Sequence, residues 1–385
     1  MCDGDRSFPG IHQASPGAFY EEHRQETIAA ISRVLDSGVY ILGEEVQAFE
    51  REFSRQFGFG DAVGVASGTD ALALALRALG VGRGDLVATV SHTAVATVAA
   101  IEMAGASPVF VDIGSDTYTM DPEALARTLE TSDRLKAVVV VHLYGQPADV
   151  PAIAGIARQY DARVVEDCAQ AAGARLDGHY AGTMADIAAF SFYPTKNIGA
   201  IGDGGMVAAN NLEWISKVRA LRQYGWGPDR VSEQLGINSR LDELQAAVLR
   251  VRLQYLDAGN RRRANIAGAY DRGLADSGLA LPLKRRGATH VYHQYVVRHR
   301  ERDRLREHLD RNGVGTNIHY AVPVHRQPAY AGRCRIDRGG LGVTDAVARE
   351  VLSLPMYPEL SDAAVERIVD AIASFSRFMP TPAPR

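Results

Sequence analysis

The strongest constraint on the fold is a regular alternation of short apolar segments and amphipathic segments between residues 63 and 209. Continuous apolar runs such as AVVVVHL are typical of strands covered on both faces, as in α/β proteins. The expected strands are 63–66, 86–90, 108–112, 137–143, 163–166, 187–192 and 206–209. The expected helices between them are 70–79, 93–104, 122–130 and 150–160. The sequence therefore predicts a seven-stranded sheet covered by helices.

Helical spacing dominates outside this block. Tight-turn residues at 177–181 and 199–205 predict hairpin links, so the sheet is expected to be mixed. Further helices are expected at 21–37, 44–57, 212–223, 240–258, 260–276, 301–311 and 361–376. We expect an N-terminal arm at 1–20, a large domain at 21–255, a small C-terminal α+β domain at 256–377 and a disordered Pro-rich tail at 378–385.

Composition excludes several classes of protein. The 385 residues are 46% hydrophobic and 23% charged with a net charge of −4, which is ordinary for a soluble globular protein and favours no nucleic-acid partner. No apolar run reaches the roughly 20 residues of a membrane helix. The three cysteines, Cys2, Cys168 and Cys334, fit neither a zinc motif nor a disulfide framework, so no metal is expected. With no signal-peptide pattern at the start, a cytoplasmic location is expected.

One lysine stands between a buried segment and a glycine-rich loop. Lys196 lies in FSFYPTKNIGAIGDGGM, residues 190–206, just after an expected strand. A loop of this kind lets a large ligand approach an amine that can act as a nucleophile. Taken alone, the same pattern fits a surface lysine in a tight turn equally well.

The segment Ala66-Ser67-Gly68-Thr69-Asp70 joins the first expected strand to a helix. The free amide groups and dipole of a first helical turn favour a phosphate, and the hydroxyl groups could add donors. The alternative is an ordinary helix N-cap, in which the hydroxyl serves only the backbone.

Two further segments carry polar residues at the ends of expected elements. In VVEDCAQ, Asp167 follows an apolar strand and could anchor a cationic ring nitrogen, or it could serve as a cap or structural ion pair. His142 ends a strand at the same edge of the sheet. Taken alone, it is best interpreted as a core histidine whose hydrogen bonds are made within the protein. In GINSRLDE, Asn238 and Arg240 precede a helix and are available to a ligand, or they merely cap the loop.

Together these residues favour a ligand that carries a phosphate, a cationic heteroaromatic ring and a carbonyl group. Pyridoxal 5′-phosphate (PLP) has all three. A lysine forms a Schiff base with its aldehyde, a carboxylate keeps its pyridine nitrogen protonated, and a helix N-terminus holds its phosphate. Lys196 would then move the proton between carbon centres.

Four motifs resemble the DegT/DnrJ/EryC1/StrS family of PLP-dependent nucleotide-sugar aminotransferases. They are ASGTDALALALRALG, VVEDCAQAAGA, FSFYPTKNIGAIGDGG and GINSRLDELQAAVL, which follow one another along the chain in the order of the family. The resemblance implies an aspartate-aminotransferase (type I) fold and a homodimer with shared active sites.

By this resemblance Lys196 is the Schiff-base lysine, Asp167 pairs with the pyridine nitrogen and Gln170 lies near the ring hydroxyl. The phosphate is bound by Gly68, Thr69, Ser191 and, from the partner subunit, Asn238. The sugar pocket is lined by Tyr193, Tyr224, His319 and Tyr320. Where the family often has an aromatic residue that stacks on the ring, this chain has Ala94, within VSHTAVAT. The ring cover is left open, with His92 a candidate.

The implied reaction moves an amino group from L-glutamate to a nucleotide-diphosphate-linked keto-deoxyhexose. The SHT and NIHYAVPVHRQPAY segments favour a 3-keto over a 4-keto sugar. A dehydratase of the same family has histidine in place of this lysine. Because the chain has Lys196, the resemblance favours transamination over dehydration. The alternatives are an aminotransferase of the same fold that acts on a cyclitol ketone, and a non-catalytic PLP-binding regulator. A nucleotide-binding α/β protein is disfavoured because the chain has no phosphate-loop or dinucleotide motif.

Overall fold

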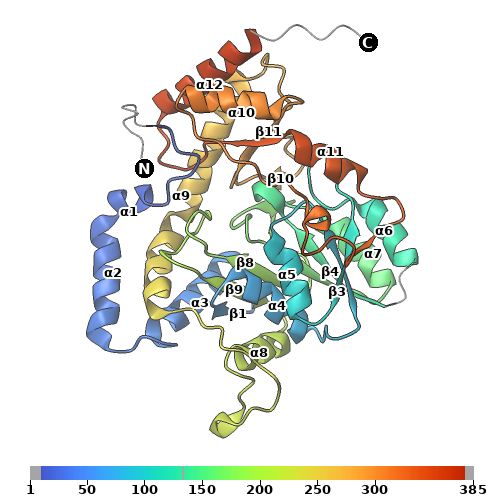
Figure 1. The fold of residues 1–385 in the computed structure, drawn as a ribbon. Coiled ribbons are helices and arrows are strands. Elements are labelled where there is room, and N and C mark those ends of the chain that lie inside the picture. The colour runs from blue at the N-terminus through green and yellow to red at the C-terminus, as the bar shows by residue number, and fades with distance from the viewer. Residues whose placement is uncertain (1–9, 132–133, 378–385) are drawn as a thin grey trace.

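A mixed β-sheet forms the centre of the molecule (Figure 1). The computed structural model describes residues 10–131 and 134–377. The strand order is β1-β9-β8-β5-β4-β2-β3-β12, and β9 runs antiparallel to both of its neighbours. The strands are β1 (Asp61–Val65), β2 (Leu86–Val90), β3 (Ser107–Val111), β4 (Leu135–Val141), β5 (Arg163–Asp167), β8 (Ile187–Ser191), β9 (Gly205–Ala209) and β12 (Arg335–Ile336).

The seven expected strands are confirmed to within two residues at each end, and the sheet is mixed as expected. The eighth strand, β12, was not expected because it has only two residues, both exposed, and so carries no apolar run. It extends the sheet by pairing parallel to β3. The expected hairpin at 177–181 is confirmed by β6 (Arg175–Leu176) and β7 (His179–Tyr180), which β10 (Ala288–Thr289) joins.

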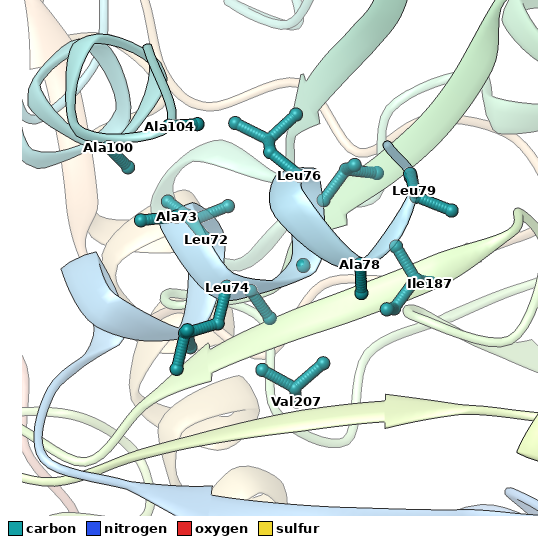
Figure 2. Packing of buried hydrophobic residues seen from close by; sticks show 14 of the residues in the cluster. Leu72, Ala73, Leu74, Leu76, Ala78, Leu79, Ala100, Ala104, Ile187 and Val207 are labelled. Carbon is teal, nitrogen blue, oxygen red and sulfur yellow. The ribbon is translucent and has the colours of Figure 1, made fainter. Parts of the chain in front are cut away.

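Helices cover both faces of the sheet. On one face, α4 (Gly68–Ala78) packs over β8 and β9, with Leu74 near Val207 and Ala78 near Ile187 in Figure 2. It is buried on nearly all sides because α5 (Val95–Met103) and α8 (Leu212–Leu221) pack around it. On the other face, α3 (Glu44–Phe57) places Phe53 edge-on against Phe190 of β8, with ring centres 5.0 Å apart. Hydrophobic packing on both faces of the sheet therefore fixes the position of β8 and β9.

A single helix, α9 (Glu243–Gly273), spans 31 residues and runs along one side of the molecule beside α2 (Arg24–Ser37) (Figure 1). The expectation of separate helices at 240–258 and 260–276 is wrong. A glycine inside a helix costs only about 1 kcal/mol relative to alanine, so packing overrides the break expected at Gly259. The division of the chain near residue 255 falls within this helix and stays a prediction.

The C-terminal part has its own core. There β11 (Tyr295–Arg298) and β13 (Val351–Leu354) pair antiparallel, and α10 (Arg302–Arg311) and α12 (Asp362–Arg377) pack together at the top of Figure 1. The remaining helices are α1 (Ala18–Glu22), α6 (Pro122–Glu130), α7 (Val150–Gln159) and α11 (Gly342–Glu350). The predicted tail at 378–385 and most of the first half of the arm lie outside the described residues. Within the described ranges, no helix has the length and apolarity that a membrane span requires.

Candidate active site

Lys196 lies in the turn that follows β8, where its backbone amide donates to the carbonyl oxygen of Tyr193 at 2.8 Å. Burial of its side chain lowers the pKa of Lys196 to about 8, although the negative charge of Asp167 acts in the opposite direction. A lysine with this pKa is largely a neutral amine in mildly alkaline solution, and the neutral amine is the nucleophile. The side chain is half-buried, so Lys196 is not a fully solvated surface lysine.

Asp167 is the last residue of β5 and is buried. Its carboxylate accepts hydrogen bonds from the Thr97 hydroxyl at 2.9 Å and from the Ala169 amide at 3.1 Å. Burial raises the pKa of Asp167, while these two donors and the charge of Lys196 lower it. Within the described part of the chain the carboxylate forms no ion pair at salt-bridge distance, so a protonated ring nitrogen is a fitting partner.

A second group of hydrogen bonds centres on Gln170, three residues after Asp167. The Gln170 side chain accepts from the backbone amide of Tyr144 at 2.7 Å and donates to the hydroxyl of Tyr320 at 3.1 Å. The Tyr144 hydroxyl donates to the carbonyl oxygen of His319 and lies 2.7 Å from Nε2 of His92. These contacts bring the predicted residues His92, Gln170, His319 and Tyr320 together.

His92 is fully buried, and burial lowers its pKa to about 4, so its ring is neutral. Because the Tyr144 hydroxyl gives its hydrogen to His319, Nε2 of His92 carries the ring proton and donates to Tyr144. Nδ1 is then an acceptor, and it has no hydrogen-bond partner among the described residues. A buried acceptor of this kind is costly unless a bound group supplies a donor.

The first turn of α4 meets the end of β8. A Cβ atom added to Gly68 would lie 2.6 Å from Cβ of Ser191, so only glycine allows this approach. The Ser67 hydroxyl accepts from the Asp70 amide at 3.1 Å, which confirms the N-cap interpretation for that residue. The side chain of Thr69 is not used in this cap, and the free amide groups of a first helical turn can bind an anion such as phosphate. Gly68, Thr69 and Ser191 are thus brought together.

His142 is confirmed as a satisfied core histidine. Its Nδ1 accepts from the Ala148 amide at 3.0 Å, and its Nε2 lies 3.0 Å from a carboxylate oxygen of Glu166. Glu166 also accepts from backbone amides, including that of Gly182 at 2.7 Å. These buried groups brace the strand ends and leave the neighbouring Asp167 free for the site.

The other predicted residues lie at the surface. Tyr193 has 53% of its area exposed, and Tyr224 has 41%. Tyr224 and Asn238 belong to the loop between α8 and α9, which extends at the bottom of Figure 1, and the Tyr224 amide donates to the carbonyl oxygen of Ile237 at 3.0 Å. Within the described ranges, no hydrogen bond joins the side chain of Tyr224 or Asn238 to Lys196 or Asp167.

The sequence did not indicate two residues that form hydrogen bonds with the predicted site residues, Thr97 and Tyr144. Tyr144 follows β4 at the same sheet edge as Asp167, so its position was a usable signal; it has the unusual backbone φ of 60°. Thr97 lies within α5, and nothing in its spacing indicates that its hydroxyl reaches Asp167. Only the packing of α5 on the sheet brings the two together.

A half-buried lysine near a buried carboxylate at the strand ends, with a helix N-terminus of the kind that binds phosphate beside them, defines a PLP-dependent transaminase of the type I fold. The chain belongs to the DegT/DnrJ/EryC1/StrS aminotransferase family, whose model matches residues 21–373. Its cofactor is therefore pyridoxal 5′-phosphate.

Individual relatives agree with this assignment. The chain is 47% identical over 360 residues to a dTDP-3-amino-3,4,6-trideoxy-alpha-D-glucose transaminase of Streptomyces venezuelae, covering 93% of this chain and 94% of the relative. It is similar to the crystal structure of S. venezuelae DesV in complex with a ketimine intermediate, with a TM-score of 0.94 and 45% identity over 97% of this chain and 100% of that one. The Bacillus subtilis protein NtdA, with bound cofactor PMP, gives a TM-score of 0.88 at 28% identity, covering 97% and 87% of the two chains.

Proposed function

We propose that this nucleotide-sugar aminotransferase moves the amino group of L-glutamate to a 3-keto deoxyhexose carried on a nucleotide diphosphate. The observation that carries the proposal is the Lys196–Asp167 pair, a nucleophilic amine with a buried carboxylate beside it. The choice of the 3-keto position is supported by the names of relatives. Those from Streptomyces venezuelae, Micromonospora megalomicea and Aneurinibacillus thermoaerophilus are all 3-amino-sugar transaminases.

The residues present fit the cofactor. Among the described residues, Asp167 forms no ion pair at salt-bridge distance and the acceptor Nδ1 of His92 has no donor, while the first turn of α4 is placed to hold an anion. When bound, PLP supplies an electron-accepting ring that stabilises negative charge on the substrate carbon. In the proposed assignment Asp167 would hold the ring nitrogen, Gln170 would lie near the ring hydroxyl, and His92 would cover the ring in place of an aromatic residue at 94.

The phosphate is assigned to Gly68, Thr69 and Ser191, with Asn238 reaching it from the partner subunit of a homodimer. The exposure of Asn238 supports an action between subunits. The sugar is assigned to Tyr193, Tyr224, His319 and Tyr320. Lys196 would hold the cofactor as a Schiff base and, once released by the amine substrate, would carry the proton between the two carbon centres.

A second candidate is a PLP-binding regulator, because two relatives carry regulatory names. One is the pleiotropic regulatory protein of Geobacillus stearothermophilus at 40% identity, and the other is the erythromycin biosynthesis sensory transduction protein EryC1 of Saccharopolyspora erythraea at 45%. A regulator without transamination would leave the absorbance of the bound cofactor unchanged when glutamate is added. A cyclitol-ketone aminotransferase would show the change but would aminate no sugar.

The proposal is tested with purified enzyme, L-glutamate and a panel of acceptors: nucleotide-linked 3-keto sugars, nucleotide-linked 4-keto sugars and a cyclitol ketone. Products are scored by mass. We expect the amino product from 3-keto sugars at a kcat/KM at least about tenfold above that for 4-keto sugars, since misplacing the reacting carbon by one ring position is costly. Preferential amination of 4-keto sugars or of the cyclitol would overturn the proposal.

A further inference from the structure

Three turns that follow strands of the central sheet carry residues of the candidate site. Tyr144 lies after β4, Gln170 lies after β5, and Lys196 lies after β8. The strands fix where each turn begins, but contacts from outside the sheet must fix where its side chains lie. One side chain of the long helix α9, Asn260, makes such contacts with two of the turns.

Asn260 uses both ends of its amide group. Its Oδ1 accepts a hydrogen bond at 2.7 Å from the side-chain amino group of Asn197, the residue after Lys196. Its Nδ2 donates to the carbonyl oxygen of Ala172 at 3.0 Å, in the turn that contains Gln170. A single side chain of α9 therefore joins the turn after β8 to the turn after β5.

The third turn is connected through Asn197. Its amino group also donates to the carbonyl oxygen of Val291 at 3.0 Å, and the amide of Val291 donates to the carbonyl oxygen of Gly145 at 2.9 Å. Gly145 belongs to the turn after β4 that holds Tyr144. Oδ1 of Asn197 is buried without a hydrogen-bond partner among the described residues, so the amino group makes both of these connections.

The partners of the two amide groups define how each is oriented. A backbone carbonyl oxygen can only accept, so the groups that face Val291 and Ala172 are amino groups. Close packing also holds Asn260 in place. A Cβ atom added to Gly173 would lie 2.6 Å from Nδ2 of Asn260, and Gly173 has a positive φ of 86°. Only glycine allows the turn after β5 to approach this side chain so closely.

We propose that Asn260 is a positioning residue, which fixes the place of the Lys196 turn relative to the turn that follows Asp167. The inference rests on the proposed function for the roles of Lys196 and Asp167. Capture of PLP joins Nζ of Lys196 to the aldehyde carbon and releases water, so its rate depends on where the amine lies. A displacement of about 1 Å at a reacting group can cost roughly 10²-fold in rate.

The test uses the cofactor-free, full-length protein and follows its capture of PLP by absorbance. We expect Asn260→Ala to capture PLP at least about tenfold more slowly than the wild type. The circular dichroism band of the bound cofactor should also change, because this band depends on how the protein orients the ring. Asn265→Ala is the matched control, since Asn265 is exposed on α9 and forms no side-chain hydrogen bond within the described ranges. Its capture rate should change less than about twofold.

A second variant, Asn197→Ala, removes the same contact from the other side and leaves α9 unchanged. It should also slow capture at least about tenfold. The loss in the double variant should be well below the product of the two single losses, as for residues in direct contact. Thermal unfolding gives the folded fraction of each variant. A loss of capture no greater than the loss of folded protein would show a merely structural role and overturn the proposal.

Two further results would contradict it. One is equal capture rates and equal dichroism in Asn260→Ala and Asn265→Ala, and the other is a double variant whose loss equals the product of the single losses. Lys196→Ala separates this proposal from the role of the lysine: capture as fast as in the wild type would overturn both. A wild type that captures PLP through Lys196 but does not respond to glutamate would contradict the proposed function alone.

Discussion

The hydroxyl of Thr97 donates a hydrogen bond to the carboxylate of Asp167 at 2.9 Å, and the Thr97 oxygen lies 3.0 Å from that of Thr93. Together with the Ala169 amide, this donor favours the ionised form of a carboxylate whose pKa burial raises. A residue of α5 therefore helps to keep Asp167 negatively charged, as a partner of a protonated ring nitrogen must be.

Replacing Thr97 with valine removes that donor and leaves the shape of the side chain nearly unchanged. We expect the glutamate half-reaction to slow roughly tenfold, since a hydrogen bond to a charged group is lost. The absorbance of the bound cofactor should titrate at a different pH, which a purely structural role would not produce. Thr97→Ser should restore both properties, and Thr93→Val should have a smaller effect; equal effects at the two positions would contradict this role.

The pKa of Lys196 predicts how cofactor capture depends on pH. Because burial lowers this pKa to about 8, the neutral amine becomes the major form above about pH 8 in the cofactor-free protein. The rate of PLP capture, followed by absorbance, should therefore rise through a midpoint near that value. In Asp167→Asn the midpoint should move lower, because the Asp167 charge raises the pKa of Lys196. A midpoint near that of an exposed lysine would show that Lys196 is solvated.

Gly68 should be intolerant of a side chain. In Gly68→Ala the new Cβ would lie 2.6 Å from Cβ of Ser191, so the helix start and the strand end must separate. We expect PLP affinity, measured by fluorescence titration, to fall roughly tenfold through this overpacking. Gly155→Ala is the control, because nothing lies within 4 Å of its added Cβ. Unchanged affinity in Gly68→Ala would remove the α4 N-terminus from the phosphate site.

Asn238 is predicted to act on the site of the partner subunit. A mixed dimer of Lys196→Ala and Asn238→Ala chains then contains one complete site, made of Lys196 from one chain and Asn238 from the other. Activity should reappear on mixing. Mixing Lys196→Ala with Asp167→Asn should restore nothing, because each site then lacks one residue of its own chain. If the first mixture recovers no more than the second, Asn238 acts within its own subunit or not at all.

The sequence predicts the parts of this molecule that depend on local pattern. The apolar run ending in His142 identified β4, and the positions of Lys196 and Asp167 just after or at strand ends placed them at one edge of the sheet. Helix α9 was divided wrongly at Gly259 because its continuity depends on packing with α2 and α3, which a local pattern does not contain.

Contacts between distant segments were the part of the site that the sequence could not predict. The Thr97–Asp167 hydrogen bond spans 70 residues, and the Gln170–Tyr320 bond spans 150. Neither leaves a periodic signal, since each depends on how two elements pack.

The most direct test of the central claim, that Lys196 carries PLP-dependent transamination, is the absorbance spectrum of the purified protein before and after addition of L-glutamate. We predict a yellow protein whose long-wavelength band falls as the amino group is transferred. In Lys196→Ala the rate of this change should drop by at least about 10²-fold, the usual contribution of a positioned acid–base group. In Lys217→Ala, which removes an exposed lysine of α8, the rate should not change. An unchanged wild-type spectrum with glutamate would contradict the claim.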